Sequence, residues 1–480
     1  MSKVKQAIIN ASITSVLLQG IALCSAIAVA RLLTPEQIGT YAVVAALVMI
    51  LSEFKALGAG VYLVREEQID CSSVRSALGL TLLMSWLLAV LILLLAFPIA
   101  RYYRIEEAPL LLLILSSTFV ITPYVSIPYA LLVRAMDFAA LRTIKLVSAL
   151  VSFVATIIGI VWGLSFYALA LGYALGFATQ LLLLNMPYRP AQMQYRPKFR
   201  QMQGIASMGL LTTAAEFLKR ASQVMPDLVI GRVGSTFEVG IFSRGQGFVQ
   251  FLSDGLRMGV GIVSLPYLAE IKRSGGDLAA AYIRGSALFN ALAWPVLAVA
   301  ALTSLPVIRV LFGEQWDAAA PIAKVLMAYA GLKTVHFQFH SFVIALGNPK
   351  LTLLREGLNV PAMALVCILL YPYGMVTIAL GFVVVACLEA CLLTLLLRQL
   401  TGLDIQRFCI ALLHNLAMTV LCALPCWLFS IYYDFQQGKP LLIVGCLALV
   451  MPLWWLFCLK FLRHPLYSQL WSSRKAIAEC

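Results

Sequence analysis

The chain has 480 residues, of which 62% are hydrophobic and 12% are charged, and its formal net charge is +14. Soluble domains carry about 25% charged residues, and a mean hydropathy of +0.93 leaves too little polar surface to cover a globule in water. The composition therefore excludes a soluble enzyme. It predicts a protein that crosses the membrane many times, because each crossing needs roughly 20 apolar residues.

Apolar runs bounded by Gly, Pro and charged residues predict fourteen membrane helices. The expected spans are 8–31, 38–64, 76–97, 108–133, 144–165, 166–186, 204–232, 236–269, 279–311, 319–346, 351–371, 372–397, 409–431 and 441–462. The first span is preceded by Lys3 and Lys5 and resembles a secretory signal. We interpret it as a membrane helix, because it is longer than a signal core and takes part in an internal repeat.

The orientation follows from the basic residues in the loops. An even number of spans places both termini on one side, and most of the 35 lysines and arginines fall in segments on that side. The positive-inside rule therefore predicts cytoplasmic N- and C-termini. The most basic loop runs from Tyr188 to Arg200. Contact of such loops with anionic lipid head groups explains the net charge, and no nucleic-acid partner is expected.

A shift of 201 residues reveals an internal repeat. It aligns Arg31 with Arg232, Gly39 with Gly240, Val48 with Val249, Leu51-Ser52 with Leu252-Ser253, Gly58 with Gly259 and Gly60 with Gly261. Further along, Pro98-Ile-Ala-Arg101 resembles Pro306-Val-Ile-Arg309. Six helices separate the copies, so both halves enter the membrane in the same direction, and such a repeat places a substrate path between two bundles.

The predicted fold is therefore an all-α polytopic membrane protein with two six-helix lobes around a central cavity. The first lobe is expected at residues 1–200 with helices 1 to 6, and the second at 201–400 with helices 7 to 12. Residues 401–480 would add helices 13 and 14 and a cytoplasmic tail.

No metal site or resident cofactor is predicted. The eleven cysteines lie mostly inside apolar stretches and form no CxxC pair. His336 and His340 are one helical turn apart, which favours a polar lining or an interhelical hydrogen bond over a metal site. No Walker A sequence is present. The expected energy source is an H⁺ or Na⁺ gradient, the membrane potential or the substrate gradient itself.

Charged side chains inside the expected helices mark the candidate site, because a charge at the bilayer centre costs at least about 2.5 kcal/mol. Span 204–232 places Glu216, Arg220, Gln223 and Asp227 on one face, with Lys219 beside it. Span 236–269 places Gln246, Gln250, Asp254 and Arg257 on one face, with Arg244 apart. Span 38–64 carries Glu53 and Lys55, and span 319–346 carries Lys324, Lys333, His336 and His340.

Two interpretations of these charges remain open. They can form structural pairs, such as Glu216 with Arg220 or Asp254 with Arg257, or they can line a water-filled cavity. Two polar faces that continue over several turns favour the cavity. Mixed signs indicate an anionic, hydroxyl-rich cargo that is held by Lys and Arg, with acidic groups left for charge balance or proton coupling.

Two stretches of the chain resemble a known family. Ala30-Arg-Leu-Leu-Thr-Pro-Glu-Gln-Ile-Gly-Thr-Tyr41, followed by Leu51-Ser-Glu-Phe and by Leu57-Gly-Ala-Gly leading to Val64-Arg65, resembles the opening of Wzx-type polysaccharide exporters of the MOP superfamily. Leu311-Phe-Gly-Glu-Gln-Trp316 and the helix count also resemble that family. The insertion Lys55-Ala-Leu before Gly58 departs from the Asp-x-Gly of many relatives.

The resemblance implies a transporter, not an enzyme. It would flip undecaprenyl-pyrophosphate-linked oligosaccharide repeat units from the cytoplasmic to the outer leaflet of the bacterial inner membrane by alternating access between two lobes. Its further partners would be membrane lipids and a polysaccharide polymerase and co-polymerase. We expect Lys219, Arg220, Arg244, Arg257 and Lys55 to contact the anionic cargo, and Glu216, Asp227, Asp254 and Glu53 to balance charge or couple transport to an ion.

Three other functions stay open. A lipid II flippase also has fourteen helices and binds a pyrophosphate. A multidrug or solute antiporter of the same superfamily would share the two lobes, although twelve helices would suffice and fewer cavity cations would be expected. A polysaccharide polymerase or ligase would need a sizeable outside loop, and the outside loops here are short.

Overall fold

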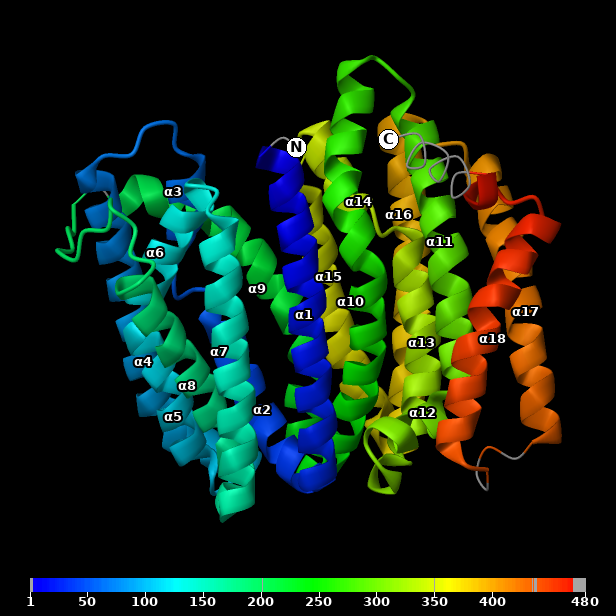
Figure 1. The fold of residues 1–480 in the computed structure, drawn as a ribbon, viewed down its shortest axis with the longest axis horizontal. Coiled ribbons are helices and arrows are strands. Elements are labelled where there is room, and N and C mark those ends of the chain that lie inside the picture. Colours follow the sequence, from blue (N-terminus) through cyan, green and yellow to red (C-terminus); the bar gives the residue numbers. More distant parts are fainter. Residues whose placement is uncertain (1–2, 201, 349, 434, 436–437, 469–480) are drawn as a thin grey trace. The chain divides into compact units, whose positions relative to one another are not determined.

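The computed structural model describes residues 3–200, 202–348, 350–433, 435 and 438–468, and its regular structure there is helical (Figure 1). The α-helices are α1 (Lys3–Leu32), α2 (Pro35–Ser52), α3 (Ala59–Arg65), α4 (Cys71–Tyr103), α5 (Ala108–Ile121), α6 (Pro123–Arg134), α7 (Phe138–Gly159), α8 (Tyr167–Asn185), α9 (Met202–Val233), α10 (Thr236–Arg273), α11 (Leu278–Leu302), α12 (Ser304–Leu311), α13 (Ala319–Val335), α14 (Phe339–Leu346), α15 (Lys350–Leu370), α16 (Met375–Thr401), α17 (Ile405–Tyr432) and α18 (Pro440–Phe461). Three short elements complete the list: η1 (Ile160–Leu164), η2 (Glu314–Trp316) and η3 (Tyr371–Tyr373). The last part of the predicted tail, residues 469–480, lies outside the described residues.

The predicted all-α fold is confirmed, and each of the fourteen expected segments contains one helix or a pair of helices. The pairs are α2 with α3, α5 with α6, α11 with α12, and α13 with α14. The bend of 48° between α5 and α6 falls at Pro123, which starts α6. Proline lacks a backbone N–H and clashes with the preceding turn. Pro128 and Pro295, by contrast, lie inside continuous helices.

Ten helices of the described chain are each long and apolar enough to cross a membrane, and the bent pair α5 and α6 brings the number to eleven. The remaining predicted spans correspond to α9, α10 and the pair α13 and α14. Helices α9 and α10 carry many charged residues, and α13 has 17 residues. The chain is a multi-pass membrane protein.

The helices form two compact units. Unit 1 contains Met1–Ser243 and Arg355–Ala364, and unit 2 contains Arg244–Leu354 and Leu365–Cys480. Helix α9 belongs to unit 1 because it packs on α2, α3 and α4. This grouping by contacts differs from the lobe boundaries at residues 200 and 400, which the repeat defines and which stay a prediction.

The repeat has a structural counterpart at the starts of α2 and α10. Thr34 and Gln37 form a capping box in front of α2, with Gln37 N–H donating to Thr34 Oγ1 at 3.3 Å. Ser235 and Glu238, each 201 residues further on, form the same arrangement in front of α10, with the Ser235 N–H donating to Glu238 Oε2 at 2.9 Å. Both repeats therefore begin this helix with the same satisfied backbone donors.

Two glycines of the repeat let these helices cross closely inside unit 1. A Cβ on Gly39 would strike the Thr236 carbonyl oxygen, and a Cβ on Gly240 would strike the Pro35 carbonyl oxygen. Each helix thus packs its glycine against the first residue of the other helix. This reciprocal contact explains why the shift of 201 residues matches glycine with glycine at these positions.

We expect Gly240→Ala to destabilise the protein, because the added methyl group meets backbone atoms that cannot rotate away. Overpacking of this kind costs typically about 1–3 kcal/mol. Gly247→Ala on the same helix is the matched control, because a Cβ there meets no atom of the described residues within 4 Å. Thermal unfolding of the detergent-solubilised protein should show a lower midpoint for Gly240→Ala alone. Equal midpoints would contradict the close crossing.

The basic loop docks on the first turns of α4. The Lys198 N–H donates to the Arg75 carbonyl at 2.9 Å, and Lys198 Nζ donates to Ser72 Oγ at 2.6 Å. Asp70 caps α4, and hydrogen bonds from Ser73 hold the pKa of its carboxyl below the ordinary value. The loop and the start of α4 therefore lie on the same side of unit 1. Helix α4 is 33 residues long, and its other end is at Tyr103.

Candidate functional site

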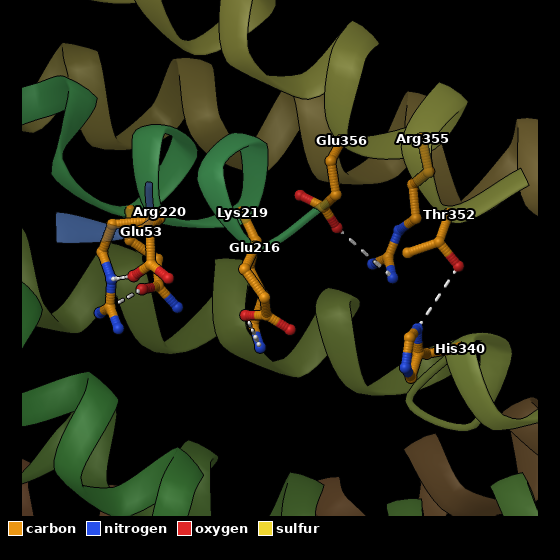
Figure 2. A network of polar contacts seen from close by, with 9 residues as sticks. Glu53, Glu216, Lys219, Arg220, His340, Thr352, Arg355 and Glu356 are labelled. Carbon is orange, nitrogen blue, oxygen red and sulfur yellow. Dashed lines mark hydrogen bonds and ion pairs between the residues drawn. The ribbon is translucent and has the colours of Figure 1, made fainter. Parts of the chain in front are cut away.

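Helix α9 carries most of the charged residues that the sequence singles out in unit 1, the others being Glu53 and Lys55. Its polar positions are Glu216, Lys219, Arg220, Gln223 and Asp227. Their spacing of three, four or seven residues keeps them near one face of the helix. Figure 2 shows the first three of them together with Glu53, which follows α2, and with Arg355 and Glu356 of α15.

Arg220 forms the central contact of this group. Its Nε lies 3.2 Å from Glu53 Oε1, and its Nη1 donates to Gln223 Oε1 at 3.1 Å (Figure 2). The two charged side chains are 37% and 22% exposed. The sequence left open a structural pair between Arg220 and Glu216. In the structure, Arg220 pairs with Glu53 instead. Arg220 is thereby oriented by two acceptors while part of its guanidinium stays open.

The break between α2 and α3 places Glu53 beside α9. Glu53 follows the last residue of α2, and Leu57 and Gly58 take positive φ values of 38° and 73°. A Cβ on Gly58 would strike Gly209 of α9. Positive φ and this backbone contact both favour glycine. The connection is therefore held against α9, with Glu53 beside Arg220.

Lys219 and Lys55 have weaker partners. Lys219 Nζ lies 3.3 Å from Glu216 Oε2, and both side chains are more than half exposed. Exposed pairs of this kind contribute little, about 0–1 kcal/mol, so an anion can compete for Lys219. Lys55 Nζ lies 5.7 and 5.2 Å from the ring centres of Phe119 and Phe177. Aromatic faces attract a cation without neutralising its charge.

Asp227 differs from the other acidic candidates. Its Oδ1 is buried and has no hydrogen-bond partner among the described residues. An ionised carboxylate is costly when one of its oxygens is buried without a hydrogen bond. Uptake of a proton or a small cation removes that cost, so this residue has the chemistry expected of an ion-coupling group.

Two further charged residues of unit 1 were not predicted. Arg355 and Glu356 lie within α15, their side chains are 17% and 13% exposed, and Arg355 Nη1 lies 4.0 Å from Glu356 Oε1 (Figure 2). A Cβ on the next residue, Gly357, would lie 4.0 Å from Leu218 of α9. Two adjacent charges inside the apolar span 351–371 were the signal that could have identified them.

Unit 2 holds the remaining candidates. The Arg244 guanidinium lies 5.0 Å from the ring centres of both Phe312 and Trp316, and its buried Nε finds no hydrogen-bond partner within the described part of the chain. Asp254 and Arg257 are exposed on α10. The roles of all nine candidates in binding or coupling stay predictions.

A second polar cluster in unit 2 joins α13 to α16. Lys333 pairs with Glu389, and both side chains are largely buried at 13% and 14% exposure. His336 Nδ1 lies 2.8 Å from the Tyr282 hydroxyl, and its Nε2 lies 3.1 Å from the Ala390 carbonyl. These contacts fit a neutral imidazole that donates through Nε2, and they confirm an interhelical role for His336.

His340 makes a local contact in the same unit. Its Nδ1 lies 3.4 Å from Thr352 Oγ1 (Figure 2). Glu389 was missed by the sequence reasoning, although it is a single carboxylate inside the apolar span 372–397.

We expect Glu389→Gln to destabilise unit 2 strongly, because it leaves the Lys333 ammonium buried without a counter-charge. Breaking a buried pair costs about 3–5 kcal/mol. Glu270→Gln is the matched control, since Glu270 and Arg273 form an exposed pair. The measurement is the thermal unfolding midpoint in detergent. A double variant with Lys333→Met and Glu389→Gln should recover most of the loss, and a single variant as stable as the control would contradict the pairing.

Comparison with known proteins adds a family and a fold. The profile of a family described as polysaccharide biosynthesis protein matches residues 28–321. The succinoglycan biosynthesis transport protein ExoT of Rhizobium meliloti is 23% identical over 323 residues, which is 66% of this chain and 64% of that protein. The teichuronic acid biosynthesis protein TuaB of Bacillus subtilis is 23% identical over 299 residues, 62% of this chain and 61% of that protein. The chain thus matches a little over three fifths of each of these relatives.

Among solved structures, the lipid II flippase MurJ in an inward closed conformation has the same fold. The TM-score is 0.75 at 14% sequence identity, and the match covers 96% of this chain and 99% of that one. At this identity the likeness concerns the path of the helices. The likeness therefore shows the fold, and the function is argued from the family and the residues.

Proposed function

Because this chain belongs to the polysaccharide biosynthesis protein family, we propose that it flips lipid-linked polysaccharide precursors across the membrane. In the finer form of the proposal, the cargo is an undecaprenyl-pyrophosphate-linked oligosaccharide repeat unit. It moves from the cytoplasmic to the outer leaflet of the bacterial inner membrane by alternating access, with both termini of the protein in the cytoplasm. A polysaccharide polymerase and co-polymerase would use the product.

The observation that carries the proposal is the cation group on α9. Arg220 and Lys219 lie on a helix of a membrane protein, where a charge is costly unless it serves a purpose. Their carboxylate partners, Glu53 and Glu216, leave both cations partly exposed. A diphosphate offers several anionic oxygens to such groups, and guanidinium binds phosphate through two parallel hydrogen bonds. The apolar tail of the cargo can stay in the bilayer.

The names of the relatives support the same class of cargo. ExoT is named for the transport step of succinoglycan biosynthesis, and TuaB for teichuronic acid biosynthesis. We propose a transporter for this chain on that ground and on the fold that it shares with MurJ. The coupling ion, H⁺ or Na⁺, belongs to the proposal as well, with Asp227 as its binding group.

Deletion of the gene, followed by mass spectrometry of the lipid-linked saccharides, tests the function. We expect oligosaccharide repeat units on undecaprenyl pyrophosphate to accumulate on the cytoplasmic leaflet, with surface polysaccharide restored by a plasmid copy. Accumulation of lipid II would instead identify a lipid II flippase. Unchanged saccharides together with increased drug sensitivity would identify a multidrug antiporter. Either of the last two results would contradict the proposed cargo.

A further inference from the structure

A pocket of about 720 Å³ lies in unit 1 at the far end of α4. It is lined by Tyr103, Arg104 and the turn from Gly231 to Thr236, which joins α9 to α10. None of these residues belongs to the group around Arg220. The volume falls within the range of about 300–1,000 Å³ that is typical of small-molecule sites.

In the proposed orientation, the pocket lies on the outer side of the membrane. Helix α4 starts at Cys71, where the basic loop docks, and ends at Tyr103 beside the pocket. Its 33 residues rise by about 50 Å, at 1.5 Å per residue, which exceeds the roughly 30 Å hydrocarbon core of a bilayer. The positive-inside rule places the basic loop in the cytoplasm. The pocket therefore opens toward the leaflet that receives the cargo.

The two arginines of the pocket have no carboxylate partner among the described residues. Arg104 ends α4 in the left-handed conformation, with φ 57° and ψ 40°, and its side chain is exposed. The Arg232 guanidinium lies 4.7 Å from the ring centre of Tyr102, which orients it and leaves its charge uncompensated. The carboxylate nearest in sequence to the turn, Glu238, accepts hydrogen bonds from Ser235. Glu106 and Glu107 are exposed on the segment that follows Arg104.

In the corresponding segment of unit 2, the arginine is paired with a carboxylate. In the register that aligns Pro98 with Pro306, Arg101 corresponds to Arg309 and Arg104 to Phe312. Arg309 forms a bidentate salt bridge with Asp317, with Nε 2.9 Å from Oδ1 and Nη2 2.7 Å from Oδ2. Phe312 is one of the two rings that cover Arg244. Arg104 therefore has no charged counterpart in unit 2, where the aligned residue is Phe312 and the neighbouring Arg309 is paired.

We propose that this pocket binds the phosphate-bearing sugar headgroup of the cargo on the outer side of the membrane. The guanidinium groups of Arg104 and Arg232 would hold the phosphate oxygens. The Tyr103 ring and the Ser235 hydroxyl offer stacking and hydrogen bonding to a sugar. This inference rests on the proposed function, and it adds a second anion site, separate from Arg220, at which the headgroup is held after translocation.

The binding test uses the full chain in nanodiscs of neutral phosphatidylcholine. The probe is a radiolabelled short-chain prenyl diphosphate that carries N-acetylglucosamine, and the variants are Arg104→Ala, Arg232→Ala and the double variant. In this assay the reference protein and the variants all carry Arg220→Ala, so that the site proposed on α9 does not bind the probe. We expect the double variant to bind the probe at least tenfold more weakly, which is the scale of losing charged hydrogen bonds. Replacement of both residues by Lys should retain part of the affinity, because the charge remains. Arg273→Ala is the control, from an exposed pair at the other end of α10.

A second arm separates the cargo from ordinary lipid. The same titration is repeated in nanodiscs that contain phosphatidylglycerol, whose headgroup also carries a phosphate. We expect the probe to retain its affinity. Displacement of the probe in proportion to the phosphatidylglycerol content would assign the pocket to lipid headgroups and overturn the inference. So would a double variant that binds like the reference protein, or a correctly folded reference protein that does not bind.

Export in the deletion strain distinguishes the failure of the inference from the failure of the proposed function. We expect the double Ala variant to restore surface polysaccharide several-fold less well than the wild type at equal protein level. If the wild-type gene is not needed for export at all, the proposed function fails. If the wild type exports while the double variant both binds and exports normally, the pocket inference alone fails. Size-exclusion elution of each variant verifies that it is folded.

Discussion

Replacement of Arg220 by alanine is expected to abolish polysaccharide export and to lower the stability of the protein at the same time. The guanidinium is held by Glu53 and Gln223, so its removal leaves the Glu53 carboxylate unpaired. The stability loss should stay well below the roughly 3–5 kcal/mol of a fully buried pair, because the two side chains are 37% and 22% exposed. The export loss should be tenfold or more, on the scale of charged hydrogen bonds to the diphosphate.

A double variant separates these two effects. Glu53→Gln with Arg220→Gln removes both charges and keeps side chains that can hydrogen-bond, so we expect near wild-type thermal stability with export still absent. Arg220→Lys should export weakly, because it keeps the charge but loses the planar fork. Arg273→Ala serves again as the exposed control. Full export by the double variant would show that Arg220 only orders the break between α2 and α3.

The positions of the helices could be predicted from the sequence because the apolar runs set them. Each run of about 20 apolar residues must satisfy its backbone inside the bilayer as a helix. The breaks were harder to predict. Pro123 marks one of them, but the break from Glu53 to Gly58 depends on the contact of Gly58 with Gly209, which lies far away in the sequence. Helical periodicity carries no information about such a contact.

The sequence identified most charged residues of the candidate site, but it did not predict which of them pair with one another. An i,i+4 spacing favours a pair between Glu216 and Arg220. In the structure, Arg220 pairs with Glu53, and Glu216 pairs with Lys219. A partner 167 residues away depends on how α2 packs on α9. Arg355, Glu356 and Glu389 were overlooked, although each breaks an apolar run as plainly as Asp227 does.

Asp227→Asn is expected to abolish the dependence of transport on the ion gradient. Of the four acidic candidates, Glu53 is paired with Arg220, Glu216 is paired with Lys219, and Asp254 is exposed. Asp227 has a buried oxygen without a hydrogen-bond partner in the described part of the chain. A carboxylate in that position gains most from binding a proton or a cation, because binding removes the cost of its desolvated charge. Asparagine has nearly the same shape, but its amide takes up no proton near neutral pH and lacks the negative charge that attracts a cation.

Proteoliposomes that carry a fluorescent lipid-linked oligosaccharide make the test quantitative. We expect the initial flipping rate of the wild type to rise when a pH gradient or a Na⁺ gradient is imposed, and the rate of Asp227→Asn to be the same with and without it. The variant should be at least as stable as the wild type, because it removes a buried charge, and this distinguishes lost coupling from lost folding. Glu106→Gln, in an exposed segment, is the matched control. If Asp227→Asn still responds to the gradient, the coupling group must be sought among the paired carboxylates, where release of Arg220 or Lys219 would accompany ion binding.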